Sequence, residues 1–249
     1  MGIFKKLFKN GAAPCYLTPM LGPAQYSGDK DLSRGVNELI WKLPLLPLKK
    51  RLLTPVITER IVEIPFVLRN LPPAPCKVLD FGSTSSPLVL EMASIGYKVT
   101  GVDLRPYGFT HPNLEFYIGD FAERRSDPDA YDAVTAVSSV EHCGLESYGA
   151  STKESGDKKI VGLFRKILKP KGVLLLTVPY GRRGENEGYR VYDKERLEDL
   201  LEGFELRQKL LYAWNPEEQW VLSDESGLKD VDCLGPRVRG VALVIAVKP

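Results

Sequence analysis

The sequence predicts an α/β fold with a largely parallel sheet, and three features of residues 77–179 support this prediction. An apolar run at 77–81 breaks into a turn of small residues, and a second run at 98–103 ends on a carboxylate. Further apolar runs follow at 113–118, 131–137 and 173–178. Strands separated by helices and loops in this way are typical of parallel sheets.

Acids at two strand ends mark the expected binding edge of this sheet. Open α/β sheets bind ligands at the carboxyl ends of their strands, where the winding changes direction. Asp80 and Asp103 are 23 positions apart, about one strand–helix–strand step. An acid at the tip of the second strand is placed to bind the two hydroxyls of a ribose. The spacing predicts a nucleoside-cofactor site, although both acids could also serve only as caps of their strands.

The turn after residue 81 favours S-adenosylmethionine over a dinucleotide. The dinucleotide fingerprint G-x-G-x-x-G uses its second glycine to let the backbone approach a pyrophosphate. Gly82, Thr84 and Pro87 occupy the three glycine positions, so only the first glycine is present. S-adenosylmethionine has no phosphate and needs only a turn with accessible amides and a nearby acid. A nicotinamide-dependent oxidoreductase is an open alternative, because it would share the acid at residue 103.

Four motifs in the right order resemble those of the class I S-adenosylmethionine-dependent methyltransferases. The first family motif, acid-x-Gly-x-Gly-x-Gly, is matched by Asp80 and Gly82. It departs at Thr84 and Ser86, where the family has glycines that supply unusual backbone angles. The other motifs lie at residues 113–121, 131–137 and 163–179. The resemblance implies a Rossmann-like, seven-stranded methyltransferase sheet whose last strand is antiparallel.

This resemblance implies S-adenosylmethionine as the cofactor. Asp103 would hold the ribose, and Asp80 with Gly82 would position the methionine end. Asp120 and Phe121 would frame the adenine, although a Gly-Asp pair is also a common turn former. The remaining cofactor candidates are Ser83, Leu104 and Ser138.

The segment after the fourth predicted strand is expected where the methyl group meets its acceptor. Residues 138–142, Ser-Ser-Val-Glu-His, resemble the Leu-Glu-His element of ubiquinone-pathway and related small-molecule O-methyltransferases. With the later strings Tyr-Gly, Gly-Asp and Thr-Val-Pro-Tyr-Gly, the chain looks closest to methyltransferase-like proteins of bacterial surface-polysaccharide clusters.

His142 and Glu141 are the catalytic candidates in this segment. A neutral hydroxyl is a poor nucleophile until a base takes its proton, and a histidine with an ordinary pKa of about 6.5 accepts a proton at neutral pH. His142 is one of only two histidines, and the other, His111, precedes a proline and is typical of a loop residue. A structural role for Glu141 and His142, bonding the loop backbone, stays open.

The carboxyl-terminal part supplies the end of the sheet and the candidate acceptor contacts. Residues 203–206 begin a strand and residues 240–247 form a clear final strand. A long polar insertion at 214–235 lies between them, and long loops on such scaffolds are often functional. The candidates for stacking on a sugar or binding a phosphate are Tyr180, Arg182, Arg183 and Trp220. The two arginines could instead be a solvated surface pair.

Residues 1–75 are expected to form a mainly helical N-terminal extension, and residues 76–249 the methyltransferase domain. Residues 58–68 look like a helix that docks just before the first strand. Residues 1–9 are basic and amphipathic, as in a short interfacial helix. This pattern allows a peripheral contact with the inner face of a membrane, and a frayed or core-docked helix is the alternative.

Composition agrees with a cytoplasmic enzyme. The formal net charge is +2, which gives no support to a nucleic-acid partner. The four cysteines are scattered without a C-x-x-C pair, so we expect neither a structural zinc nor a disulfide framework. No run approaches the ~18 apolar residues needed to span a bilayer.

These features together predict an S-adenosylmethionine-dependent methyltransferase. The resemblance, rather than the residue chemistry, points to O-methylation of a hydroxyl on a sugar, a glycan or a glycolipid precursor. A non-catalytic S-adenosylmethionine-binding or scaffold protein is the other alternative, because the altered turn at residues 83–86 could abolish methyl transfer.

Overall fold

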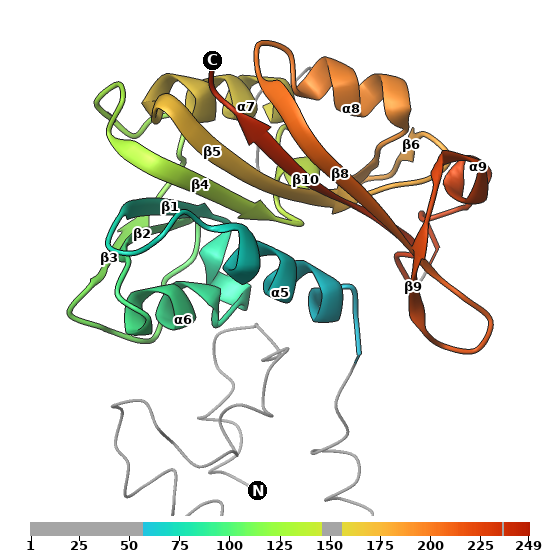
Figure 1. Ribbon diagram of the computed structural model, residues 1–249, viewed down its shortest axis with the longest axis horizontal. Helices are drawn as coiled ribbons and strands as arrows, with labels where there is room; N and C mark the ends of the chain where they lie inside the picture. The colour runs from blue at the N-terminus through green and yellow to red at the C-terminus, as the bar shows by residue number, and fades with distance from the viewer. Residues whose placement is uncertain (1–56, 146–155, 236) are drawn as a thin grey trace, which may run out of the picture. The chain divides into compact units, whose positions relative to one another are not determined.

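An eight-stranded sheet organises the residues that the computed structural model describes, which are 57–145, 156–235 and 237–249 (Figure 1). Its strand order is β3-β2-β1-β4-β5-β10-β8-β9. The five parallel neighbours are β1 (Lys77–Phe81), β2 (Lys98–Asp103), β3 (Leu114–Ile118), β4 (Tyr131–Val137) and β5 (Leu168–Pro179). The winding changes direction between β1 and β4, so the carboxyl ends of these two strands form the switch point at which ligands bind in such sheets.

The remaining strands complete the other side of the sheet. β10 (Gly240–Val247) runs antiparallel to both of its neighbours, β5 and β8 (Glu205–Trp214). The predicted antiparallel last strand is therefore confirmed, whereas the predicted count of seven strands is wrong. The eighth strand, β9 (Trp220–Ser223), comes from the polar insertion and pairs with β8. Asn215 closes this hairpin by accepting the amide of Gln219 at 2.8 Å.

Helices cover both faces of the sheet, which explains why its central strands are apolar on both sides. In Figure 1, α5 (Arg60–Asn70) and α6 (Leu88–Ser94) lie on one face, and α7 (Gly156–Ile167) and α8 (Lys194–Leu200) lie on the other. Each face has its own apolar core. Phe66 and Met92 belong to the first core, and Phe164 and Leu197 belong to the second.

Short elements lie at the carboxyl edge of the parallel strands and beyond it. The single-turn helices η1 (Ser83–Ser85) and η2 (Val140–His142) follow β1 and β4. A two-stranded ribbon of β6 (Gly184–Glu185) and β7 (Arg190–Val191) follows β5. α9 (Glu225–Leu228) follows β9.

The compact unit that contains the sheet begins at Thr58 and continues to Pro249. It therefore includes residues 58–75, which we expected in the extension, and α5 packs on the sheet through the buried side chains of Phe66 and Val67. The basic segment 1–9 and the Glu-Ser-Tyr-Gly string at 146–149 lie outside the described residues. Within the described ranges, none of the helices has the length and apolarity needed to cross a membrane.

The centre of the sheet should carry most of the packing energy. Leu176 of β5 is fully buried and pairs with Ala136 and Val244 on the two sides. We expect Leu176→Ala to lower the free energy of unfolding by ~2–5 kcal/mol, because it leaves a cavity that the flanking strands cannot fill. Leu222→Ala on β9 is the control, since Leu222 is 65% exposed, and it should change stability by less than ~0.5 kcal/mol. Urea denaturation of both variants measures this, and equal losses would contradict the assignment of the core.

Candidate functional site

The turn after β1 and the acid at the end of β2 form one hydrogen-bonded unit. One oxygen of Asp103 accepts the amide of Thr84 at 3.0 Å, and the other accepts the amide of Arg105 at 3.0 Å. The guanidinium of Arg105 also lies 3.3 Å from this second oxygen. The side chain of Asp103 is only 8% exposed. Its carboxylate is therefore fixed at the carboxyl edge of the sheet, where the sequence predicts an acid that binds the ribose.

Asp80 and Ser83 lie beneath this turn. Asp80 is buried and accepts the hydroxyl of Thr135 at 2.5 Å, which joins β1 to β4. Burial raises the pKa of the Asp80 carboxyl to about 6, although hydrogen bonds from Thr135 and Ser83 oppose this shift. The hydroxyl of Ser83 donates to the Asp80 carbonyl at 2.8 Å and accepts the Val102 amide at 3.2 Å. Ser83, a predicted cofactor residue, thus uses its buried side chain to hold the turn.

Gly82 brings the turn after β1 into contact with the turn after β4. Its φ of +81° lies in the left-handed region, which a side chain rarely adopts. A Cβ on Gly82 would lie 2.6 Å from the Cβ of Ser139. Both the backbone angle and the lack of space therefore require glycine here. The predicted cofactor turn and the predicted acceptor turn touch at this point.

Two apolar side chains stay exposed where β2 and β3 end. Leu104 is 53% exposed and Ile118 is 56% exposed. Asp120 lies two residues after Ile118. Its carboxylate accepts the amide of Ala122 at 2.8 Å, so it caps its own turn. Leu104 and Asp120 are predicted cofactor residues. Ile118 is not among the predicted cofactor residues. Its position as the last residue of a strand, two residues before Asp120, is the sequence feature that could have identified it.

Phe121 is placed differently from its predicted role beside an adenine. It is 3% exposed, and its ring packs edge-on against Phe81 with centroids 5.7 Å apart. The ring of Phe164 lies 5.6 Å from it. The Phe121 side chain therefore belongs to the core beneath α7 and does not face the carboxyl edge of the sheet as an exposed surface.

His142 is held in one tautomer by the loop between β6 and β7. Its Nδ1 lies 2.5 Å from the carbonyl oxygen of Gly188. Because a carbonyl only accepts hydrogen bonds, Nδ1 carries the proton and Nε2 is the basic nitrogen. Burial lowers the pKa of His142, and the charges of Arg60 and Arg105 lower it further. The imidazole is therefore neutral near pH 7, and Nε2 is able to take a proton.

Ser138 links the end of β4 to helix α5. Its hydroxyl donates to Glu63 at 2.6 Å, and Glu63 is fully buried and pairs with Arg60 at 3.0 Å. Arg60 also donates to the carbonyl of Val137 at 2.9 Å. Ser138 has a φ of +42°, a conformation that persists in a non-glycine residue only where the surroundings hold it. The side chain of this predicted cofactor residue is thus bonded to α5.

Glu141 is buried beside the same helix. It is 2% exposed, and among the described residues its Oε2 has no hydrogen-bond partner. Its Oε1 lies 3.9 Å from Nε2 of His142. Burial raises the pKa of Glu141 well above its ordinary range, and repulsion from Glu63 and Glu59 adds to this. The two predicted catalytic residues are therefore neighbours, one a neutral base and the other a buried carboxyl whose Oε2 lacks a hydrogen-bond partner among the described residues.

The sequence alone did not reveal four residues that hold this site. Arg60 and Glu63 are spaced as on a solvated helix face, and only the packing of α5 on the sheet buries Glu63 and partly buries Arg60. Gly188 orients His142 through its backbone, which leaves no sequence signal. Arg190 is 4% exposed and donates to the carbonyl of Cys143 at 2.5 Å, so it fixes the end of η2. Arg190 follows the Tyr-Gly-Arg-Arg-Gly loop in the sequence, and nothing in that sequence indicates that its side chain is buried.

The predicted acceptor contacts fall in separate places. Tyr180 is 1% exposed, and its hydroxyl donates to Glu225, so it anchors α9 instead of facing an open site. Arg182 is exposed and pairs with Asp232 at 3.1 Å. Arg183 is exposed as well, in agreement with the surface-pair alternative for both arginines.

Trp220 is the acceptor candidate that lies beside α5. It is partly buried and packs against the apolar core that contains Phe66 and Val67 of that helix. Its ring meets that of Trp214 edge-on, with centroids 5.6 Å apart. Among the described residues, its buried Nε1 has no hydrogen-bond partner. Trp220 therefore has an unsatisfied donor that is buried on the α5 face of the sheet.

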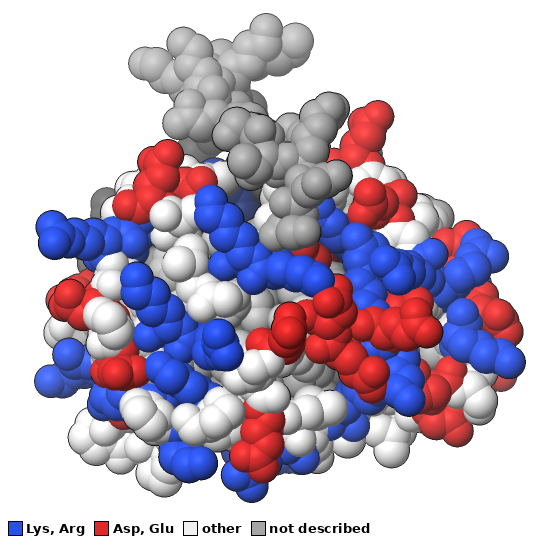
Figure 2. Space-filling model, turned by 90° about the horizontal axis from the view of Figure 1, so that it is seen from above, with Lys and Arg blue, Asp and Glu red and all other residues white. Residues whose placement is uncertain are grey.

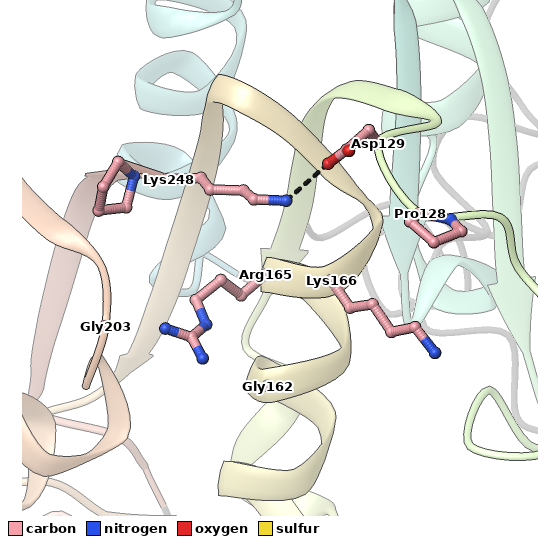
Figure 3. Close-up of a pocket in the computed structure, with 8 residues that line it drawn as sticks. Pro128, Asp129, Gly162, Arg165, Lys166, Gly203 and Lys248 are labelled. Carbon is pink, nitrogen blue, oxygen red and sulfur yellow. Dashed lines mark hydrogen bonds and ion pairs between the residues drawn. The ribbon is translucent and has the colours of Figure 1, made fainter.

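A surface pocket of about 530 Å³ lies at the opposite edge of the sheet (Figure 3). Arg165 and Lys166 line it, and Lys248 pairs there with Asp129 at 2.7 Å. Asp129 precedes β4 and Gly203 precedes β8, so this pocket is at the amino ends of the parallel strands. None of the predicted site residues lines it. The basic side chains at the end of α7 suit the negative end of a helix dipole.

Surface charge and metal ligands add little to the candidate site. On the face seen in Figure 2, Lys and Arg side chains are interspersed with Asp and Glu, without a continuous basic surface. Over the described ranges, no three His, Cys, Asp or Glu side chains are grouped so that they could hold a metal ion.

Comparisons with known proteins agree with this fold. A family model described as "Caenorhabditis protein of unknown function, DUF268" matches residues 116–225. No curated protein matches the chain. Similar solved structures include S-adenosylmethionine-dependent methyltransferases.

One of these is the 1,6-didemethyltoxoflavin-N1-methyltransferase of Burkholderia thailandensis, crystallised with S-adenosylhomocysteine. It is 12% identical over 90% of this chain and 92% of its own, with a TM-score of 0.53. The phosphoethanolamine N-methyltransferase 2 of Haemonchus contortus is 17% identical over 76% of this chain and 52% of its own, with a TM-score of 0.52. The cyclase SpnF is 18% identical over 76% of this chain and 80% of its own, with a TM-score of 0.53. These matches show that the chain has the Rossmann-like fold of class I methyltransferases, a fold that a cyclase shares.

The raised pKa of Glu141 should make stability depend on pH. Below about pH 4.3, the ordinary glutamate pKa, the carboxyl is protonated in both the folded and the unfolded state. At higher pH the unfolded state ionises first, so Glu141 lowers the free energy of unfolding until the pH passes its folded pKa. Glu141→Gln removes this loss, and its stability advantage over the parent should grow between pH 4 and pH 8. Urea titrations at several pH values measure this. Glu198→Gln, at a 57% exposed position, is the control, and a pH-independent difference for Glu141→Gln would contradict the shift.

Proposed function

We propose that this protein is an S-adenosylmethionine-dependent methyltransferase that methylates a hydroxyl of a sugar, a glycan or a glycolipid precursor. The observation that carries the proposal is the arrangement at the switch point. There the turn after β1, bonded to Asp103, touches the turn after β4, which presents the basic nitrogen of His142. A nucleoside-binding edge and a proton acceptor thus lie side by side.

The residues at the carboxyl edge fit this cofactor. Asp103 is fixed at the end of β2, where it would bind ribose hydroxyls, and Gly82 gives the turn after β1 the left-handed backbone that would receive the methionine part. Leu104 and Ile118 offer exposed apolar surface for an adenine, next to the turn of Asp120. A dinucleotide fits less well, because the amide of Thr84 donates to Asp103 and the glycines that admit a pyrophosphate are missing.

His142 supports methylation of a hydroxyl. S-adenosylmethionine supplies a methyl group on a positively charged sulfur, which leaves as a neutral thioether. The protein then needs to align the acceptor and to remove its proton, and alignment alone contributes up to ~7–11 kcal/mol. As the acceptor oxygen forms its bond to the methyl carbon, its proton passes to Nε2 of His142. The Gly188 carbonyl stabilises the resulting imidazolium through Nδ1.

The sugar acceptor is supported by the resemblance of residues 138–142 and 177–181 to polysaccharide-cluster proteins. The position of Trp220 is compatible with it, since a partly exposed indole on the α5 face offers a stacking surface. Arg182 and Arg183 lie on the surface and contribute little to this proposal.

Cofactor binding should depend on Asp103. We expect Asp103→Ala to weaken the binding of S-adenosylhomocysteine at least tenfold, which corresponds to ~1.4 kcal/mol, because two hydrogen bonds to ribose hydroxyls are lost. Isothermal calorimetry measures this, with NAD as the competing ligand for the oxidoreductase alternative. Asp127→Ala is the control, since Asp127 is exposed in the loop before β4. An affinity within twofold of the parent would remove Asp103 from the site.

Methyl transfer should depend on His142. His142→Ala should lower turnover ~10²-fold or more while S-adenosylhomocysteine still binds, because the base is lost and the cofactor edge is kept. Release of S-adenosylhomocysteine in a screen of sugars and glycan precursors provides the assay, and His111→Ala is the control. Parent activity should fall as the pH drops through the lowered pKa of His142, since the protonated ring cannot accept a proton. Turnover of His142→Ala within threefold of the parent would assign this residue to loop structure.

A further inference from the structure

Three carboxyl groups gather between helix α5 and the turn after β4. Glu59, Glu63 and Glu141 form this carboxyl cluster. Glu63 and Glu141 are buried. Besides burial, Glu63 raises the pKa of Glu59, and both Glu63 and Glu59 raise the pKa of Glu141. Glu63 is satisfied, because it pairs with Arg60 and accepts the hydroxyl of Ser138. Glu141 is not satisfied, because among the described residues its Oε2 has no partner.

A buried carboxyl without a counterion is a costly arrangement in a protein interior. Such groups are normally paired with a cation or satisfied by several hydrogen-bond donors. His142 does not provide the cation, because its Nε2 is 3.9 Å from Oε1 of Glu141 and its pKa is lowered by burial. Burial also raises the pKa of Glu59, and the neighbouring Glu63 adds to this. Arg60 offsets part of this repulsion, because it pairs with Glu63 and lowers the pKa of both Glu59 and Glu141. Oε2 of Glu141 still has no hydrogen-bond partner among the described residues, and a cationic ligand would supply one.

The position of Glu141 indicates which ligand this is. The predicted cofactor edge lies on the side of β1 and β2, where Asp80 is affected by Asp103. The charged groups that affect Glu141 are Glu63, Arg60 and Glu59, which lie in the first turn of α5 or cap it, and Arg60 also affects Asp80. Its carboxyl therefore belongs to the α5 side of the turn, next to Nε2 of His142. An acceptor whose hydroxyl donates its proton to His142 would have the substituent on the adjacent carbon beside Glu141.

We propose that the acceptor is an amino alcohol, such as an amino sugar, whose protonated amine binds Glu141 while the adjacent hydroxyl faces His142. This inference rests on the proposed function and names the class of its acceptor. The ammonium group supplies the positive charge and the hydrogen-bond donors that Glu141 lacks. A neutral sugar would supply only a hydroxyl at this point and would bring no positive charge to favour the ionised form of Glu141.

Nuclear magnetic resonance of the imidazoles tests the proposal without knowledge of the natural acceptor. The chain has only two histidines, so the ¹⁵N signals of His142 can be assigned with a His111→Asn variant. The full-length protein, saturated with S-adenosylhomocysteine, is titrated with ethanolamine and, separately, with ethylene glycol. These probes differ only by an ammonium in place of a hydroxyl. We expect ethanolamine to shift the His142 signals with an apparent Kd at least tenfold lower than that of ethylene glycol.

Variants assign the preference to Glu141. In Glu141→Gln the amide keeps the shape of the side chain but has no charge, so the tenfold difference should disappear. In Glu198→Gln, which removes an exposed carboxylate on α8, the difference should persist. Equal affinities for the two probes, no shift with either probe, or a preference that survives in Glu141→Gln would each overturn the proposal.

Calorimetry distinguishes a failure of the amino-alcohol proposal from a failure of the proposed function. If the parent protein does not bind S-adenosylhomocysteine, the proposed function itself is wrong. If it binds, and Glu141→Gln weakens this binding more than tenfold without lowering the melting temperature, the cation that Glu141 binds is the ammonium of the cofactor. That result would overturn the amino-alcohol acceptor and leave the methyltransferase proposal standing.

Discussion

The contact between Gly82 and Ser139 is the constraint on which the candidate site depends. β1 and β4 are parallel neighbours at the switch point, so the turns that follow them leave the sheet at adjacent positions. The two turns pass each other only because residue 82 has no side chain. One turn carries the bond from Thr84 to Asp103, and the other carries Glu141 and His142. A change in this single contact would move the cofactor edge relative to the proposed base.

The turn after β4 gains its chemistry from the elements that surround it. The loop between β6 and β7 fixes the tautomer of His142 through Gly188, and Arg190 holds the end of η2. Helix α5 holds the other side through the link from Ser138 to Glu63. Burial then lowers the pKa of His142 and raises the pKa of Glu141, so it favours the neutral form of both neighbours. The site is thus prepared to receive positive charge rather than to provide it.

Sequence patterns predicted the parts of the molecule that follow from local order along the chain. Strands that end on Asp80 and Asp103, and an antiparallel final strand, follow from apolar runs and their spacing. Burial that arises between distant segments was not predictable. Tyr180 and Phe121 follow strands and look available for a ligand, yet both pack into the core. Glu63 looks like a solvated helix residue, yet its side chain is buried on the inner side of α5, where Ser138 and Arg60 satisfy it. The polar insertion concealed β9, since a four-residue strand is visible only when its hairpin partner is known.

The place of β10 in the sheet has a consequence for the order in which the molecule assembles. This strand is the last regular element in the chain, yet it lies between β5 and β8 and pairs with both. The β8–β9 hairpin is therefore not joined to the parallel strands by hydrogen bonds until β10 has paired with both β5 and β8. During synthesis, the open edge of β5 and the hairpin must wait as unpaired surfaces while the last strand emerges, a state that favours aggregation or the capture of a chaperone.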